Sequence, residues 1–150
     1  LDLNNIFVIF TKADRLNKVI KKQVGIDLIE NYKRAFNILN SEIQQQNEDF
    51  KGSADPALFK SNFEKDLFKK IHDIRKNFTS INLENDYDGQ LSLLASLKKE
   101  VENFFDNVIV NDNDVVIKKN RLELLKMLCN TFDKYFNFEK IEFLNEKAGI

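Results

Sequence analysis

The fold is decided by the stretch VENFFDNVIVNDNDVVIKKNRLELLKMLCNTF, residues 101–132. Its apolar residues recur three and four positions apart on both sides of a short polar segment, and this spacing places them on one face of a helix. The stripe on the later side consists of Ile117, Leu122, Leu125, Leu128 or Cys129, Phe132 and Phe136. The stretch therefore predicts two helices joined by a buried loop, residues 106–113, in which Val108 and Val110 point inward.

The same spacing runs through most of the chain outside this stretch. It predicts apolar helical faces over residues 3–20, 26–43, 59–78 and 91–105. Asp55 followed by Pro56 is typical of a helix start, because the carboxylate accepts hydrogen bonds from free N–H groups and proline needs no partner there. Asp112 or Asn113 is expected to cap the last helix. Five helices with short connections predict an all-α bundle.

Composition limits the classes of protein to which the chain can belong. Its 150 residues, 43% of them hydrophobic, suit a single domain over residues 1–150. It has no apolar run of about 18 residues and no basic leader, so we expect no membrane contact and a cytoplasmic location. A start without methionine suggests a piece of a longer chain. The net charge of −1 excludes a polycation, so any nucleic-acid site must be a local patch.

Residues for enzyme chemistry are scarce. One histidine, His72, and one cysteine, Cys129, provide no disulfide, no zinc set and no recognisable nucleophile with its base. The sequence contains neither GxxxxGK nor GxGxxG, the glycine-rich loops that hold nucleotides. Asp112, Asn113 and Asp114 begin like a calcium loop, but the required glycine at the sixth position is missing. We therefore expect no catalytic residue and no metal ligand.

One polar cluster lies beside the apolar stripe of the predicted helix over 26–43. Lys33 and Asn37 are one turn apart, and Arg34 is next to them. An ammonium, an amide and a guanidinium group can together hold a phosphate or the edge of an unstacked base, both of which single-stranded RNA offers. The alternative is an ordinary solvated helix face.

A second polar cluster follows Phe104 and Phe105 along the chain. It consists of Lys118, Lys119, Asn120 and Arg121. The two phenylalanines either stack on bases or lie in the core, and their spacing favours the core. Arg121 has an alternative role as a tether for the loop before it, because a buried loop needs donors for its carbonyl or carboxylate oxygens. Spacing alone leaves open whether the two clusters adjoin.

Three motifs in order carry a resemblance to a known family. Residues 33–39, KRAFNIL, are similar to a KRxxNIL stretch, residues 101–110 to V-x-x-FFDxVxV, and residues 120–125 to NRLxLL. These stretches are found in the C-terminal region of the β subunit of bacterial heterotetrameric glycyl-tRNA synthetases. The resemblance extends from about Lys12 to Phe136, and Asn137 stands where the family usually has an aspartate.

The resemblance implies a DALR-type anticodon-binding bundle that binds glycine tRNA without performing chemistry. It implies that Lys33, Arg34 and Asn37 form one wall of the tRNA site and that the second cluster, residues 118–121, forms another. The expected partners are the α subunit and the rest of the β subunit, with no DNA. ATP and magnesium are expected only in the catalytic α subunit, so this piece needs no cofactor.

The alternative function is a helical protein-interaction domain that docks onto a partner subunit without touching RNA. Basic side chains gathered on one surface, with Phe104 and Phe105 buried, would favour RNA binding over this alternative.

Overall fold

The computed structural model describes residues 23–80 and 87–134, and within these ranges it contains helices and no strand. The helices are α2 (Gln23–Gln46), the short 3-10 helix η1 (Pro56–Leu58), α3 (Asn62–Ser80), α4 (Tyr87–Ala95), α5 (Lys98–Asn107) and α6 (Val115–Asp133). The predicted all-α class is confirmed. The helix predicted over residues 3–20 lies outside the described residues.

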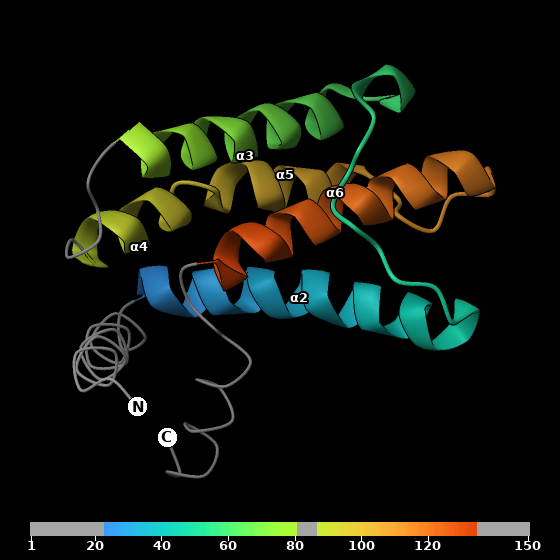
Figure 1. Ribbon diagram of the computed structural model, residues 1–150, viewed down its shortest axis with the longest axis horizontal. Coiled ribbons are helices and arrows are strands. Elements are labelled where there is room, and N and C mark those ends of the chain that lie inside the picture. Colours follow the sequence, from blue (N-terminus) through green and yellow to red (C-terminus); the bar gives the residue numbers. More distant parts are fainter. Residues whose placement is uncertain (1–22, 81–86, 135–150) are drawn as a thin grey trace, which may run out of the picture.

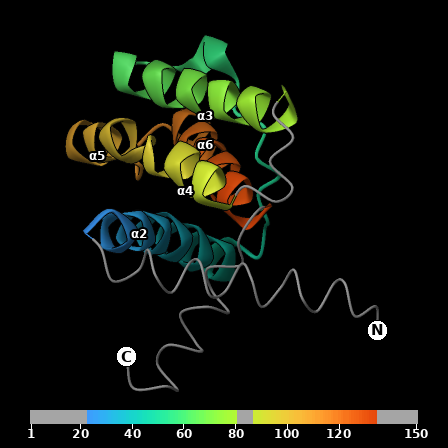
Figure 2. The same cartoon turned by 90° about the vertical axis from the view of Figure 1, so that its left-hand side faces the viewer.

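The helices form three layers. Figure 2 shows α2 on one side of the bundle and α3 on the other, with α4, α5 and α6 between them. Both α5 and α6 pack against α2 and against α3. A helix in the middle layer must be apolar on more than one face. For this reason α6 buries Leu124 and Met127 as well as the predicted stripe from Ile117 to Phe132.

One hydrophobic core joins the layers. Its largest fully buried side chains come from α3 and from the middle layer. They include Leu67 and Ile71 of α3, Phe104 of α5 and Phe132 of α6. From α2, Tyr32 reaches the same core, where its ring meets that of Phe132 edge to face at 5.8 Å between centroids. The apolar faces predicted for these four helices therefore meet in a common interior.

The start of α3 differs from the prediction. Asp55 does accept a hydrogen bond from the N–H of Ala57 at 2.9 Å, but the helix it caps is η1, which has only three residues. That turn ends because Phe59 adopts an extended backbone conformation. A second start follows, where the Ser61 hydroxyl accepts from the N–H of Glu64 at 3.4 Å and α3 begins.

The predicted helix over residues 91–105 is two helices. α4 ends at Ala95 and α5 begins at Lys98, and the hydroxyl of Ser96 between them donates to the carbonyl of Leu93 at 2.6 Å. Leu94, Leu97 and Val101 are all buried on the two sides of this break. Because the apolar spacing continues across the turn, periodicity alone did not reveal it.

The loop between α5 and α6 follows the prediction except at its end. Val108 is buried and Val110 packs partly buried against the core, as predicted, whereas Ile109 between them is 74% exposed. The cap of α6 is Asp114, neither Asp112 nor Asn113, because its carboxylate accepts from the first N–H groups of the helix. Asp112 instead accepts from the N–H of Asp114 and so shapes the turn that precedes the cap.

The lone cysteine is buried in α6. Burial raises the pKa of the Cys129 thiol to about 12, and the nearby Asp133 carboxylate adds to this effect. A thiol with a raised pKa stays protonated and unreactive at neutral pH.

We expect Cys129 to resist alkylation by iodoacetamide at pH 8 in the folded chain and to react quickly in urea. The ratio of thiolate fractions is on the order of a thousandfold. Because the folded pKa lies above that of the unfolded chain, this thiol is also expected to lower stability progressively as the pH rises from about 9 toward 12. Mass spectrometry after timed alkylation measures the rate of the thiol reaction. Equal alkylation rates in buffer and in urea would contradict the burial of Cys129.

Candidate nucleic-acid interface

The first predicted cluster lies on the outer face of α2. Lys33, Arg34 and Asn37 are all exposed, whereas Tyr32 and Ala35 on the same helix are buried. The helical repeat explains this separation, since residues three and four apart share a face and their immediate neighbours turn away. The structure thus brings an ammonium, a guanidinium and an amide group together on one exposed surface.

Arg34 is held in place by an aromatic ring. Its guanidinium carbon lies 4.3 Å from the centroid of the Phe105 ring, in a cation–π contact between α2 and α5. Among the described residues Arg34 forms no ion pair. Stacking orients the planar group without using its N–H donors, so these donors remain available to a ligand.

A hollow of about 300 Å³ opens beside this contact. It is lined by Arg34, Ile38, Glu42, Phe105, Val108, Ile109, Val110 and Asn111. Its residues come from α2, from the end of α5 and from the loop that follows α5. This hollow has the usual features of a ligand site, an apolar surface with a few polar groups at the rim.

The two lysines of the second predicted cluster lie on the part of α6 that faces α2. Lys118 forms an ion pair with Glu42 at 3.0 Å, and its side chain is only 18% exposed. Lys119 forms a more exposed pair with Glu48 at 2.9 Å, and the hydrogen bond that its ammonium group donates to that carboxylate raises the pKa of Lys119. Because Glu42 also lines the hollow, Lys118 lies at the edge of the same region.

Asn120 and Arg121 do not form an exposed wall with these lysines, which corrects the expectation from sequence. They are only 5% and 7% exposed. The Asn120 amide accepts from the backbone N–H of Asp55 at 2.7 Å and donates to its carbonyl at 3.0 Å. The polar atoms of this side chain therefore fasten the chain between α2 and α3 onto α6, a segment that crosses α6 in Figure 1.

Arg121 joins the loop before α6 to α3. Its Nη1 donates to the carbonyl of Ile109 at 2.7 Å and to the Asp112 carboxylate at 3.0 Å. Its Nη2 donates to Glu64, which is completely buried, at 3.1 Å. These contacts agree with the tether role, because Arg121 holds the loop that lines the hollow.

The segment between α2 and α3 that Asn120 fastens is also attached to α6 through Glu123, a residue that sequence reasoning did not single out. The Glu123 carboxylate accepts from three successive backbone N–H groups, of which Gly52 is the nearest at 2.6 Å. Gly52 has φ of +83°, and a Cβ there would meet the Asn130 amide at 2.8 Å. The glycine in an otherwise helical chain was the available signal for this close approach.

The two phenylalanines belong to the core. Phe104 is fully buried, and Phe105 is 8% exposed with Arg34 over its ring. Neither ring is open to stack directly on a base. This arrangement, with basic side chains outside and both rings inside, is the one that favours RNA binding over the protein-docking alternative.

No described group resembles a catalytic or metal centre. His72 is exposed and packs edge to face against Phe68. In the described ranges, no three His, Cys, Asp or Glu side chains lie where they could share a metal ion. The described helices include none with the length and apolar character needed to cross a membrane.

Comparison with known proteins agrees with the resemblance found in the sequence. The family described as the DALR anticodon binding domain matches residues 28–146. The glycine–tRNA ligase beta subunit of Rickettsia prowazekii (strain Madrid E) is 41% identical over 138 residues, which is 92% of this chain. The beta subunit of Rickettsia bellii (strain OSU 85-389) is 40% identical over 141 residues, or 94% of this chain.

The aligned region is a small part of these relatives. The chain spans 20% of the length of each of the two beta subunits. No solved structure matches the chain.

Proposed function

Because the chain belongs to the DALR anticodon-binding domain family, we propose that it recognises the anticodon region of glycine tRNA as part of a glycine–tRNA ligase. The observation that carries this proposal is Arg34, held over Phe105 at the rim of a hollow whose lining residue Glu42 pairs with Lys118. The names of the relatives support the choice of glycine tRNA. The chain binds the RNA and takes no part in the chemical step.

The hollow suits an unpaired nucleotide. An anticodon loop presents splayed bases and phosphates, and proteins read such bases by apolar contact and by hydrogen bonds to their edges. Ile109 and Val110 offer apolar contact, and the guanidinium of Arg34 offers donors for a base acceptor or a phosphate. Lys33 and Asn37 extend the same surface of α2, so that neighbouring phosphates meet further donors.

The residues of the second cluster have two different roles. Lys119 contacts phosphate, since an exposed ion pair such as its pair with Glu48 contributes little and a phosphate can replace it. Lys118 contributes positive charge beside the hollow. Asn120 and Arg121 act by positioning, because their donors are used within the protein.

The aminoacylation site, with its ATP and magnesium, belongs to a partner α subunit, and this domain joins it through the rest of the β subunit in the cytoplasm. The whole domain, residues 1–150, contributes tRNA affinity and needs no cofactor of its own.

Replacing Arg34 by alanine is expected to weaken glycine tRNA binding about tenfold, because a charge-assisted contact and an oriented guanidinium are lost together. Lys33→Ala is expected to cause a smaller loss. The dependence of affinity on salt should become shallower in both variants, since each removed phosphate contact lowers the number of released counterions. Filter binding at several salt concentrations measures both effects.

Lys65→Ala is the matched control, since Lys65 is an exposed lysine of α3 and does not line the hollow. Circular dichroism checks that every variant is folded. Folded Arg34 and Lys33 variants that bind glycine tRNA as well as the parent would remove the α2 surface from the proposal. Failure of the parent chain to retard tRNA at low salt would favour the protein-docking alternative instead.

A further inference from the structure

The buried carboxylate of Glu64 in α3 is connected to the hollow beside Arg34, although α3 lines no part of that hollow. Figure 2 shows α3 and α2 on opposite sides of the bundle, with α6 between them. The described residues that line the hollow come from α2, from α5 and from the loop before α6. Glu64 reaches this loop through Arg121, which lies on α6.

Three donors fix the position of the Glu64 carboxylate. Its Oε1 atom accepts from Nε and Nη2 of Arg121 at 3.3 and 3.1 Å, and from the Ser61 hydroxyl at 3.2 Å. Ser61 in turn accepts from the backbone N–H of Glu64, where α3 begins. Because the carboxylate is completely buried and tied to the start of its own helix, it forms a rigid anchor for Arg121.

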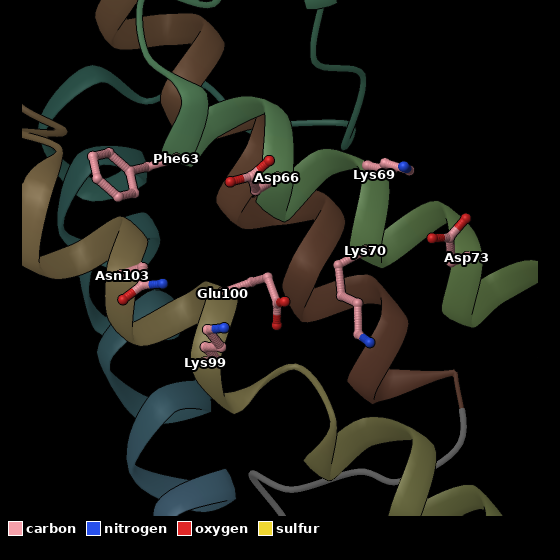
Figure 3. Close-up of a pocket in the computed structure, with 8 residues that line it drawn as sticks. All are labelled: Phe63, Asp66, Lys69, Lys70, Asp73, Lys99, Glu100 and Asn103. Carbon is pink, nitrogen blue, oxygen red and sulfur yellow. The ribbon is translucent and has the colours of Figure 1, made fainter.

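The neighbouring polar side chains of α3 do not share this position. Asp66 and Lys70 line a groove between α3 and α5, as Figure 3 shows. Three lysines and three carboxylates line that groove, so their charges cancel, and Glu64 is not among them. Asp66 is exposed to solvent, whereas Glu64 faces inward and contacts Arg121.

The planar guanidinium group of Arg121 connects this anchor to the loop. Its Nε and Nη2 atoms face Glu64, and its Nη1 atom donates to the Ile109 carbonyl at 2.7 Å and to the Asp112 carboxylate at 3.0 Å. A guanidinium group is a rigid fork, so fixing one edge also fixes the direction of the remaining nitrogen. Residues 109–111 line the hollow, and Arg121 holds the first of them and the residue that follows them.

We propose that Glu64 is a positioning residue for tRNA binding, which orients Arg121 and thereby keeps residues 109–112 in the conformation that forms the hollow. This role rests on the proposed function, and it adds a residue from a helix that lines no part of the site. Without Glu64 one edge of the guanidinium group loses its acceptor, and the arginine side chain regains rotamers that its contacts exclude. A loop that must be ordered again during binding lowers the affinity, because the ordering costs free energy.

The test compares tRNA binding and hydrogen–deuterium exchange, measured by NMR, in Glu64→Leu and Asp66→Leu. The N–H of Asp112 donates to the Val110 carbonyl at 2.9 Å, so its exchange rate reports on the order of the loop. We expect Glu64→Leu to weaken glycine tRNA binding about fivefold and to speed exchange at Asp112, because the loop loses its anchor. Asp66→Leu removes an exposed carboxylate of the same helix and should change neither quantity. A folded Glu64→Leu chain that binds tRNA as tightly as the parent would overturn the proposal.

Two further variants separate positioning from a loss of stability. Glu64→Gln keeps an acceptor oxygen for Arg121 but loses the charge, so it is expected to recover most of the affinity while remaining less stable than the parent. Glu64→Leu combined with Arg121→Met removes both buried charges, which keeps the chain folded if the single leucine variant unfolds. This double variant should still bind tRNA more weakly and exchange faster at Asp112. Parent-like affinity in the folded double variant would contradict the role of Glu64.

Arg75 offers a matched control, because it also links α3 to α6 through a guanidinium group. It donates to the Thr131 hydroxyl at 2.9 Å and to the Met127 carbonyl at 3.0 Å, and none of these three residues lines the hollow. Arg75→Met combined with Thr131→Val is expected to lower stability and to leave tRNA affinity and exchange at Asp112 unchanged. Equal losses of affinity in the two double variants would indicate a general effect of weaker helix packing and would overturn the proposal.

The same measurements distinguish this role from the proposed function. If the parent binds glycine tRNA and folded Glu64→Leu binds it equally well, Glu64 has no positioning role and the proposed function stands. If the parent does not bind tRNA but Glu64→Leu speeds exchange at Asp112, the proposed function fails and Glu64 remains the residue that orders the loop.

Discussion

Replacing Arg121 by alanine is expected to destabilise the folded chain by about 3–5 kcal/mol, because it leaves a buried carboxylate without its cation. Glu64 is fully buried, and Arg121 donates to its Oε1 through both Nη2 and Nε at 3.1 and 3.3 Å. The same substitution removes the donors that hold Ile109 and Asp112 of the loop before α6. Urea unfolding followed by circular dichroism measures the loss.

A double variant separates the buried charge from the lost packing. Arg121→Met combined with Glu64→Leu removes both charges, so it is expected to recover much of the stability lost in Arg121→Ala. Lys65→Ala, which removes an exposed cation, should change stability by less than about 0.5 kcal/mol. An Arg121→Ala chain that unfolds like the parent but binds tRNA more weakly would show that Arg121 contacts RNA and is not a tether.

Replacing Phe104 by alanine is expected to cost about 3–5 kcal/mol of stability, the usual range for a fully buried phenylalanine. Its ring packs edge to face against Phe105 at 5.6 Å between centroids, so the cavity would also loosen the ring beneath Arg34. Thermal and urea unfolding measure the effect. Ile109→Ala, at a position of the neighbouring loop that is 74% exposed, is the control and should leave stability nearly unchanged.

The same position tests whether Phe104 stacks on bases. Phe104→Leu keeps an apolar core side chain, so the variant is expected to fold and to bind glycine tRNA like the parent. A folded leucine variant with clearly weaker tRNA affinity would contradict the assignment of Phe104 to the core and restore it as a stacking surface.

Helix faces could be predicted from sequence because they depend on spacing within a few residues. Leu67 and Ile71 from one predicted stripe and Leu125 and Phe132 from another lie in the core as predicted, whereas Phe136 lies outside the described residues. The positions at which helices end or break were predicted less well. Asp55 has the features of a helix cap, but whether a turn continues depends on where the next residues can pack, and here Phe59 leaves the helical conformation.

The candidate site could be predicted in part. The exposed positions of Lys33, Arg34 and Asn37 follow from their place beside a buried stripe. The burial of Asn120 could not be predicted, because its partner Asp55 lies in the segment before α3, far away along the chain. For Arg121 the sequence offered a tether to the loop before α6 as an alternative, and only its partner Glu64 in α3 was out of reach. A polar residue beside an apolar stripe can face water or a distant partner, and local spacing does not distinguish the two.

By itself the sequence determined the helical class, the core-facing positions and the family resemblance, since each depends on residue order within one segment. Only the tertiary structure decided that α6 lies between α2 and α3, that Arg34 meets the ring of Phe105, and that Arg121 and Asn120 face inward. The physical reason is that helix formation is governed by hydrogen bonds four residues apart, whereas contacts between helices depend on how all the apolar faces are buried at once.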